Sequence, residues 1–272
     1  MTVNTAVPKM YGRCEDCGIY NMANLKKLGI NMDKWDYMIA LAGNPNTGKS
    51  TVFNALTGLR QHTGNWPGKT VTRAEGGFIY NRRGYKLVDL PGTYSLMATS
   101  LDEEVARNFV LFAKPDVTVI VVDSTRLERN LNLVLQILEI TDRAVVCLNL
   151  MDEAKRKQII VDERRLARDL GVPVIPTSAR YNQGIPELLE AVHDVATGRV
   201  VCRPHRVKSI SAKVDNIIKP LITQIKSAFP NLPNARWVAL RLLDGDMSIM
   251  NAIRDDGLGE LNHAPAFNLA VA

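Results

Sequence analysis

Long apolar runs are absent from this sequence. No stretch of its 272 residues approaches the ~18 consecutive apolar residues that a membrane-spanning helix needs. Residues Met1 to Asn24 also lack the apolar core of a secretory signal peptide. We therefore expect the chain as given to be soluble and intracellular.

Cysteine is scarce as well. Four cysteines in a chain of this length do not make a disulfide framework, and Cys147, inside an apolar stretch, is expected to be a small core residue. Cys14 and Cys17 form a C-x-x-C motif, which is half of a zinc site, while Cys202 is far away in the sequence. We favour a disordered or locally folded leader there over a metal or redox site.

Positive charge is in modest excess and is spread along the chain. The net charge of +6 and the pI near 9.2 permit an acidic partner such as RNA or an anionic membrane surface. The Lys and Arg residues, however, stand in short, separate groups such as Arg82-Arg83 and Lys155 to Lys157. Solvated faces explain such groups more simply than a nucleic-acid site.

The pattern of apolar residues divides the chain into four parts. Residues 1–35 show no sustained periodicity and are interpreted as an N-terminal extension. Residues 36–200 alternate short apolar strands with amphipathic helices, which predicts an α/β domain with a mostly parallel sheet and helices on both faces. Residues 201–263 keep only helical spacing and predict a small all-helical domain, and residues 264–272 stay unassigned.

Within the α/β part we expect the hairpin of residues 74–90 to form an antiparallel edge and residues 58–72 to be a loop. The apolar face of one helix is expected at Leu131, Val134, Leu135 and Leu138. In the helical part, Ile217, Leu221 and Ile225 lie on one stripe that crosses Pro220, where the helix should kink or a new one begin. The other expected strands cover 37–42, 117–122, 144–148 and 172–176, and the other helices cover 51–56, 100–113, 162–170 and a segment that starts near Pro186.

The most informative stretch runs from Gly43 to Ser50. It fits the phosphate-binding pattern G-x-x-x-x-G-K-[ST] without a mismatch, between a predicted strand and a predicted helix. Backbone N–H groups of such a loop cradle phosphates, Lys49 can reach the β- and γ-phosphates, and the Ser50 hydroxyl can hold Mg²⁺. The expected nucleotide contacts here are Gly43, Asn44, Pro45, Asn46, Thr47, Gly48, Lys49, Ser50 and Thr51.

Three further motifs follow later strands. Asp89 to Gly92 matches D-x-x-G, in which the Asp steadies Mg²⁺ and the Gly N–H meets the γ-phosphate. Asn149 to Asp152 matches N-x-x-D, and Thr177-Ser178-Ala179 comes after the next strand. In this order they resemble the translation-factor-like GTPases.

The second motif indicates which base is bound. The carboxylate of Asp152 can accept both N1–H and N2–H₂ of guanine, a pair of donors that adenine does not offer. Asn149 would brace the loop, and the backbone N–H of Ala179, next to Ser178, would reach O6. The residue before Asp152 is Met151 in place of the usual Lys, so we expect only moderate nucleotide affinity.

Three longer stretches resemble bacterial ferrous iron transport protein B, namely Gly64 to Val71, Val121 to Leu131 and Ala235 to Asp246. The resemblance covers about Tyr37 to Asp246 and implies a cytosolic GTP switch at the inner-membrane face, with a helical domain that slows GDP release. It implies a polytopic membrane domain outside this chain as partner, and ferrous iron as a transported substrate that this domain does not bind. It implies no nucleic acid partner and leaves a homo-oligomer open.

The same resemblance assigns roles to individual residues. Thr70 falls at the first switch, where it would bind Mg²⁺ together with Ser50 and Asp89, and Gly92 belongs to the second switch. Asn46 is at the position that coordinates K⁺ in similar potassium-activated GTPases, although it can also be a plain turn residue. Thr93 follows Gly92 where many small GTPases have Gln, so we expect slow, Mg²⁺-dependent and K⁺-stimulated conversion of GTP and water to GDP and phosphate.

Two other functions compete with this interpretation. A soluble ribosome-assembly GTPase would carry an RNA-binding module after the nucleotide domain, with aromatic platforms or a basic stripe. The tail of this chain instead reads as an ordinary set of amphipathic helices. An ATP-hydrolysing metal-insertion protein is disfavoured by Asn149 and Asp152.

Overall fold

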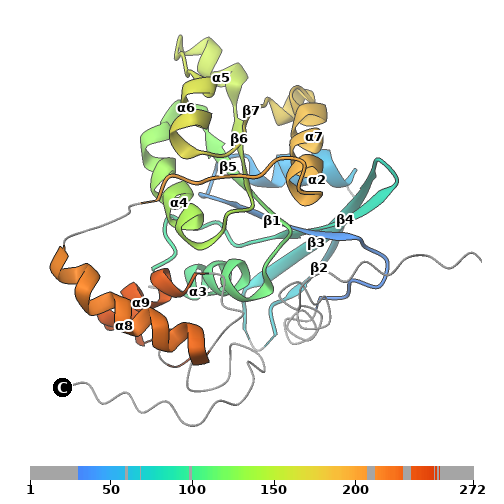
Figure 1. The fold of residues 1–272 in the computed structure, drawn as a ribbon. Coiled ribbons are helices and arrows are strands. Elements are labelled where there is room, and N and C mark those ends of the chain that lie inside the picture. The colour runs from blue at the N-terminus through green and yellow to red at the C-terminus, as the bar shows by residue number, and fades with distance from the viewer. Residues whose placement is uncertain are drawn as a thin grey trace, which may run out of the picture.

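The computed structural model describes residues 30–58, 61–67, 69–97, 100–206, 212–228, 234–247, 249 and 251. It contains a seven-stranded sheet with helices on both faces, and two further helices lie to one side, next to α3 and α4 (Figure 1). The strands are β1 Tyr37–Gly43, β2 Gln61–Asn65, β3 Thr72–Tyr80, β4 Arg83–Asp89, β5 Val117–Asp123, β6 Ala144–Asn149 and β7 Val174–Pro176. The α-helices are α2 Lys49–Thr57, α3 Leu101–Asn108, α4 Leu127–Ile140, α5 Met151–Arg156, α6 Glu163–Leu170, α7 Ile185–Ala196, α8 Ala212–Ala228 and α9 Ala235–Leu243.

The strand order β2-β3-β4-β1-β5-β6-β7 confirms the predicted mostly parallel sheet. Strands β4, β1, β5, β6 and β7 are parallel to one another. The β2–β3 and β3–β4 pairs are antiparallel, and β2 and β3 form one edge of the sheet. Because parallel strands end at the same edge of a sheet, Asp89, Gly43 and Asn149 come together there. That edge carries the candidate site.

Two cores lie on opposite faces of the sheet. Residues Ala40, Val88 and Ile120 face one core, which α3 and α4 cover, while Ile39, Leu41 and Val119 face the other, which α2 and α7 cover. This alternation is the period-two pattern of a strand that is buried on both sides. Cys147 is fully buried in the second core, as predicted, and burial raises its pKa to about 12.

Residues 30–36 precede β1 and pack on the hairpin formed by β3 and β4. Ile30 is 3 % exposed, and the Asp36 carboxylate accepts from the Gly84 N–H at 2.7 Å. A Cβ on Gly77 would lie 2.2 Å from the Trp35 ring, so only glycine allows the indole to lie flat on β3 here. Cys14 and Cys17 lie outside the described residues.

Three local predictions are corrected by the structure, and a fourth is narrowed. The segment predicted as a loop at 58–72 contains strand β2, so the sheet has one strand more than the sequence predicted. The helix predicted for 100–113 ends as α3 at Asn108 and continues as a π-helical turn, Phe109–Ala113. At Pro220, where the sequence predicted either a kink or the start of a new helix, α8 continues as one helix, which excludes the second alternative. Leu135 and Ile217 are exposed, and Ile218 is the buried neighbour.

Helices α8 and α9 pack against each other and contact the α/β part at the ends of α3 and α4. The Asn234 side chain donates to the Glu139 carbonyl at the end of α4, and Arg107 of α3, which is fully buried, pairs with Asp246 at 3.3 Å. Among the described residues, no helix is long and apolar enough to cross a membrane.

Candidate nucleotide-binding site

The phosphate-binding loop joins β1 to α2, as the motif requires. Its two sharp turns are at Asn46, with φ of 65°, and at Gly48, with φ of 80°. A Cβ on Gly48 would lie 2.5 Å from the Asn149 amide nitrogen, and a Cβ on Gly43 would lie 2.6 Å from the Val121 carbonyl. Both glycines are therefore needed for close backbone approach, at the first and second fixed positions of the motif.

One buried side chain ties the motifs together. Asn149, at the end of β6, donates from Nδ2 to the Thr47 carbonyl at 3.0 Å. Its Oδ1 accepts from the Ala179 N–H at 3.1 Å and from the Thr177 hydroxyl at 3.3 Å. Asn149 is 1 % exposed, so these bonds lie in a low-dielectric interior, where losing them is costly.

Lys49 and Asp89 meet at the centre of the site as an ion pair between Nζ and Oδ1. Both side chains are largely buried, with exposures of 12 % and 17 %. Burial raises the pKa of the Asp89 carboxyl, and the neighbouring Lys49 ammonium opposes that rise. The loop lysine thus already lies beside the D-x-x-G aspartate, and the phosphates that it is predicted to reach would compete for the same ammonium.

The second switch begins beside the phosphate loop. The Thr93 N–H donates to the Gly43 carbonyl at 3.3 Å, and the added Cβ on Gly92 would lie 3.5 Å from Pro45. Thr93 is 4 % exposed, so its side chain is packed inside the protein. These contacts place the Gly92 backbone next to the loop, as the D-x-x-G motif predicts.

The predicted base site lies at the start of α5. Leu150 has φ of 63°, and this turn leads the chain from β6 into the helix. The Asp152 N–H donates to the Ser178 hydroxyl at 3.1 Å, which fixes the distance between the two predicted base-binding segments. Met151 is half-buried and packs partly against the core.

Thr70 is the one predicted site residue that the structure leaves apart from the others. It is exposed, in a turn where the Trp66 N–H donates to the Val71 carbonyl at 2.9 Å and Lys69 pairs with Glu104 of α3 at 2.9 Å. Trp66 itself is buried edge-on against Phe109 at 5.4 Å. In the part of the chain that the structure describes, the hydrogen bonds and ion pairs of this turn do not join Thr70 to the phosphate loop.

The oxygen atoms at this site suit hard cations. Ser50 is exposed at the start of α2, and Asp89 has a carboxylate at the end of β4. Hydroxyl and carboxylate oxygens are ligands that suit Mg²⁺. Asn46 is exposed on the loop and carries an amide oxygen, which suits a larger monovalent cation. The residues present therefore fit both ions.

Comparison with known proteins decides the family. The family model described as ferrous iron transport protein B matches residues 37–192, more than half of the chain. The chain belongs to the ferrous iron transport protein B family. It is 40 % identical over 213 residues to the Fe(2+) transporter FeoB of Escherichia coli (strain K12) and 39 % identical to that of Salmonella typhimurium. In both cases the match covers 77 % of this chain and 27 % of the relative.

Solved FeoB structures match most of the chain. The cytosolic domain of T. maritima FeoB in a GDP form matches with a TM-score of 0.73 and 35 % identity, over 86 % of this chain and 89 % of that one. The cytosolic domain of L. pneumophila FeoB matches with a TM-score of 0.72 and 36 % identity, over 84 % and 89 %. The chain therefore corresponds to the cytosolic GTPase region of FeoB, and the ribosome-assembly alternative is not needed.

Two groups of residues next to the site escaped the sequence interpretation. A cavity of about 400 Å³ lies beside the phosphate loop, and Tyr94 and Arg129 line it together with Asn46. Gln136 of α4 bonds to the segment that follows the second switch. No local motif points to Tyr94 or Gln136, and the partners of Gln136 are about 40 positions away in the sequence.

Proposed function

We propose that this chain is the GTP-hydrolysing switch of a ferrous iron transporter whose membrane domain lies outside the 272 residues. Membership of the FeoB family supports this, and so does the span of the match, which covers about a quarter of the relatives' length. The GTPase part of the proposal rests on the hydrogen bonds of the Asn149 side chain, which joins the phosphate loop to both predicted base-binding segments. The switch would act at the cytoplasmic face of the bacterial inner membrane.

In this proposal ferrous iron is the transported substrate and does not bind to the switch. Residues 36–200 would form the GTPase domain and residues 201–263 a helical regulatory domain. A homo-oligomer in the membrane stays compatible with these roles.

The residues would divide the work as follows. Ser50, Asp89 and, after closure of the first switch, Thr70 would hold Mg²⁺, which supplies positive charge to the phosphate oxygens when bound. Lys49 would neutralise the β- and γ-phosphates, and the Gly92 N–H would donate to the γ-phosphate. Thr70 is exposed and does not contact these groups in the structure. The first switch would therefore have to move to bring Thr70 to the Mg²⁺ site, as in an order–disorder switch.

Asn46 would supply the site of a monovalent cation. Thr93 is buried and has no amide with which to orient water, and this position offers no substitute for the missing Gln. A cation held between the Asn46 oxygen and the phosphates would place positive charge where negative charge develops in the transition state. K⁺ suits a larger oxygen shell than Na⁺ does.

We expect GTP hydrolysis to require Mg²⁺ and to run about 100-fold faster in KCl than in NaCl, because one well-placed charge contributes roughly 10²–10³ in rate. Asn46→Ala should remove the difference. Asn46→Gly, which relieves the strain of φ at 65°, should remove it too. The measurement is the initial rate of phosphate release at matched ionic strength.

The control for this experiment is Asn81→Ala. Asn81 is an exposed asparagine that also has positive φ, 46°, and lies in the turn between β3 and β4, away from the site. It should keep the full response to K⁺. Equal rates in the two salts, or an unchanged response in Asn46→Gly, would show that Asn46 is only a turn residue.

A further inference from the structure

The segment Thr93–Met97, which we call the switch strap, runs directly after the D-x-x-G motif and lies along α4. The Leu96 N–H donates to Oε1 of Gln136 at 2.6 Å, and the Ser95 hydroxyl donates to the same atom at 3.2 Å. One glutamine oxygen therefore holds two consecutive residues of the strap. The arrangement is specific, because a backbone N–H can only donate and so requires an acceptor at this position.

The orientation of the Gln136 amide is fixed from its other side. Its Nε2 donates to Oδ1 of Asn132, one turn earlier on α4, at 3.3 Å. The amide nitrogen thus faces along the helix and the amide oxygen faces the strap. A hydrogen-bonded pair on one helix presents a pre-oriented acceptor, which loses less entropy when the strap binds.

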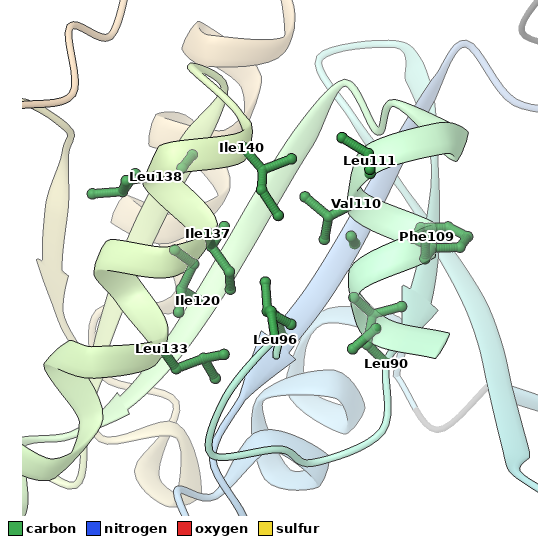
Figure 2. Close-up of a cluster of buried hydrophobic side chains, with 14 of the residues drawn as sticks. Leu90, Leu96, Phe109, Val110, Leu111, Ile120, Leu133, Ile137, Leu138 and Ile140 are labelled. Atoms are coloured by element: carbon green, nitrogen blue, oxygen red, sulfur yellow. The ribbon is translucent and has the colours of Figure 1, made fainter. Parts of the chain in front are cut away.

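Packing reinforces these bonds. Leu96 is 2 % exposed and belongs to the same core cluster as Leu133 and Ile137 of α4. Figure 2 shows Leu96 between this face of α4 and Leu90, at the end of β4. Upstream, the Arg129 guanidinium lies 4.4 Å over the Tyr94 ring. Three successive strap residues therefore bind α4 by different interactions.

The two ends of the strap reach different parts of the protein. At the start, the Thr93 N–H bonds to the Gly43 carbonyl of the phosphate loop. At the end, the Met97 sulfur accepts from Nη1 of Arg241 on α9 at 2.9 Å. The strap thus contacts the phosphate loop at one end and the helical part at the other, and Gln136 holds its middle.

We propose that Gln136 is a positioning residue for GTP hydrolysis. By holding Ser95 and Leu96 on α4, it keeps Gly92, only three residues upstream of Ser95, beside the phosphate loop, where its N–H would meet a γ-phosphate. The proposal rests on the GTPase function proposed above. Because GDP has no γ-phosphate, the strap should matter for GTP and leave GDP binding unchanged.

The test compares Gln136→Leu, which removes the acceptor at similar size, with Gln136→Glu, which keeps it. For Gln136→Leu we expect kcat for GTP to fall about tenfold, since two hydrogen bonds are lost. The Kd for GDP should stay within about twofold, and Gln136→Glu should restore most of the rate. Leu135→Ala, an exposed neighbour on the same helix, is the control and should behave like the wild type.

If Gln136→Leu lowers the unfolding midpoint, Arg129→Met tests the role of the strap independently. It removes the stack on Tyr94 at an exposed position, and kcat should fall about threefold, a typical cation–π contribution. Unchanged kcat in both variants would overturn the proposal, as would a loss of GDP affinity that equals the loss in kcat. A wild type that does not hydrolyse GTP would instead overturn the proposed function.

Discussion

Asp152→Asn is expected to change the base preference of this chain from guanine to xanthine nucleotides. The carboxylate of Asp152 would accept N1–H and N2–H₂ of guanine, whereas an amide nitrogen there would face N1–H with another donor. Xanthine has a carbonyl in place of the N2 amine, and this carbonyl can accept from the new amide. A site built around buried hydrogen bonds rejects the mismatched ligand by about 10⁴.

The local structure favours this interpretation because the position of Asp152 is fixed by its own backbone. Its N–H bonds to the Ser178 hydroxyl, so the substitution leaves the helix start in place. Competition between GDP and xanthosine diphosphate for the variant measures the change. Glu153→Gln is the matched control, since Glu153 lies next in the helix and pairs with Arg156 and Lys157 instead. No change in preference for Asp152→Asn would remove Asp152 from the base site.

Lys49→Ala should abolish GTP binding at accessible concentrations. Lys49 is the cation that faces Asp89 in the free site, so its loss leaves a largely buried carboxylate next to the incoming phosphates. Without the ammonium, the pKa of Asp89, already raised by burial, would rise further, since Lys49 is what lowers it. Leaving one charge of such a pair alone costs about 3–5 kcal/mol, or roughly 10²–10⁴ in affinity.

Lys86→Ala serves as the control for Lys49→Ala. Lys86 is similarly buried in an ion pair, with Glu75 on β3, but it lies on the hairpin away from the nucleotide. Its loss should lower the unfolding midpoint and spare nucleotide affinity. Titration with a fluorescent GTP analogue distinguishes the two variants. Similar affinity in Lys49→Ala and the wild type would contradict the assignment of the phosphate loop.

The proximity of the predicted site motifs could be foreseen from the sequence, because each motif is encoded locally. The loop from Gly43 to Ser50 carries its glycines, lysine and hydroxyl within eight residues, and each later motif begins at the last residue of a strand or directly after it. Strands that alternate with helices form a parallel sheet, and the carboxyl ends of parallel strands meet at one edge. The side chain of Asn149 therefore reaches Thr47 across 102 residues, as the motif order predicted.

The sequence predictions and the structure differ where tertiary contacts determine the local conformation. Residues 61–65, Gln-His-Thr-Gly-Asn, have no apolar alternation, and they form β2 because β3 offers an edge to pair with. Pro220 lies on the exposed side of α8, where a missing backbone bond faces water, while Ile218 and Ile225 are held in the core. Packing on the inner side of α8 therefore outweighs the local penalty.

The switch strap was invisible in the sequence for a related reason. Ser95 and Leu96 have no motif of their own, and Gln136 is an ordinary polar residue on the face of a helix. Only the fold brings them together, across 40 residues. Long-range pairs of this kind carry no spacing signal, so sequence analysis predicts residues that would bind the nucleotide and misses the residues that hold them in place.

The most direct test of the central claim is a calorimetric titration of the purified chain with GDP, a non-hydrolysable GTP analogue and the matching ATP analogue, in Mg²⁺ and KCl. If the site that Asn149 holds together binds guanine nucleotides, both guanine ligands should bind saturably. The adenine ligand should not bind even at about 100-fold higher concentration. Equal binding of the ATP analogue, or no binding of GDP, would contradict it.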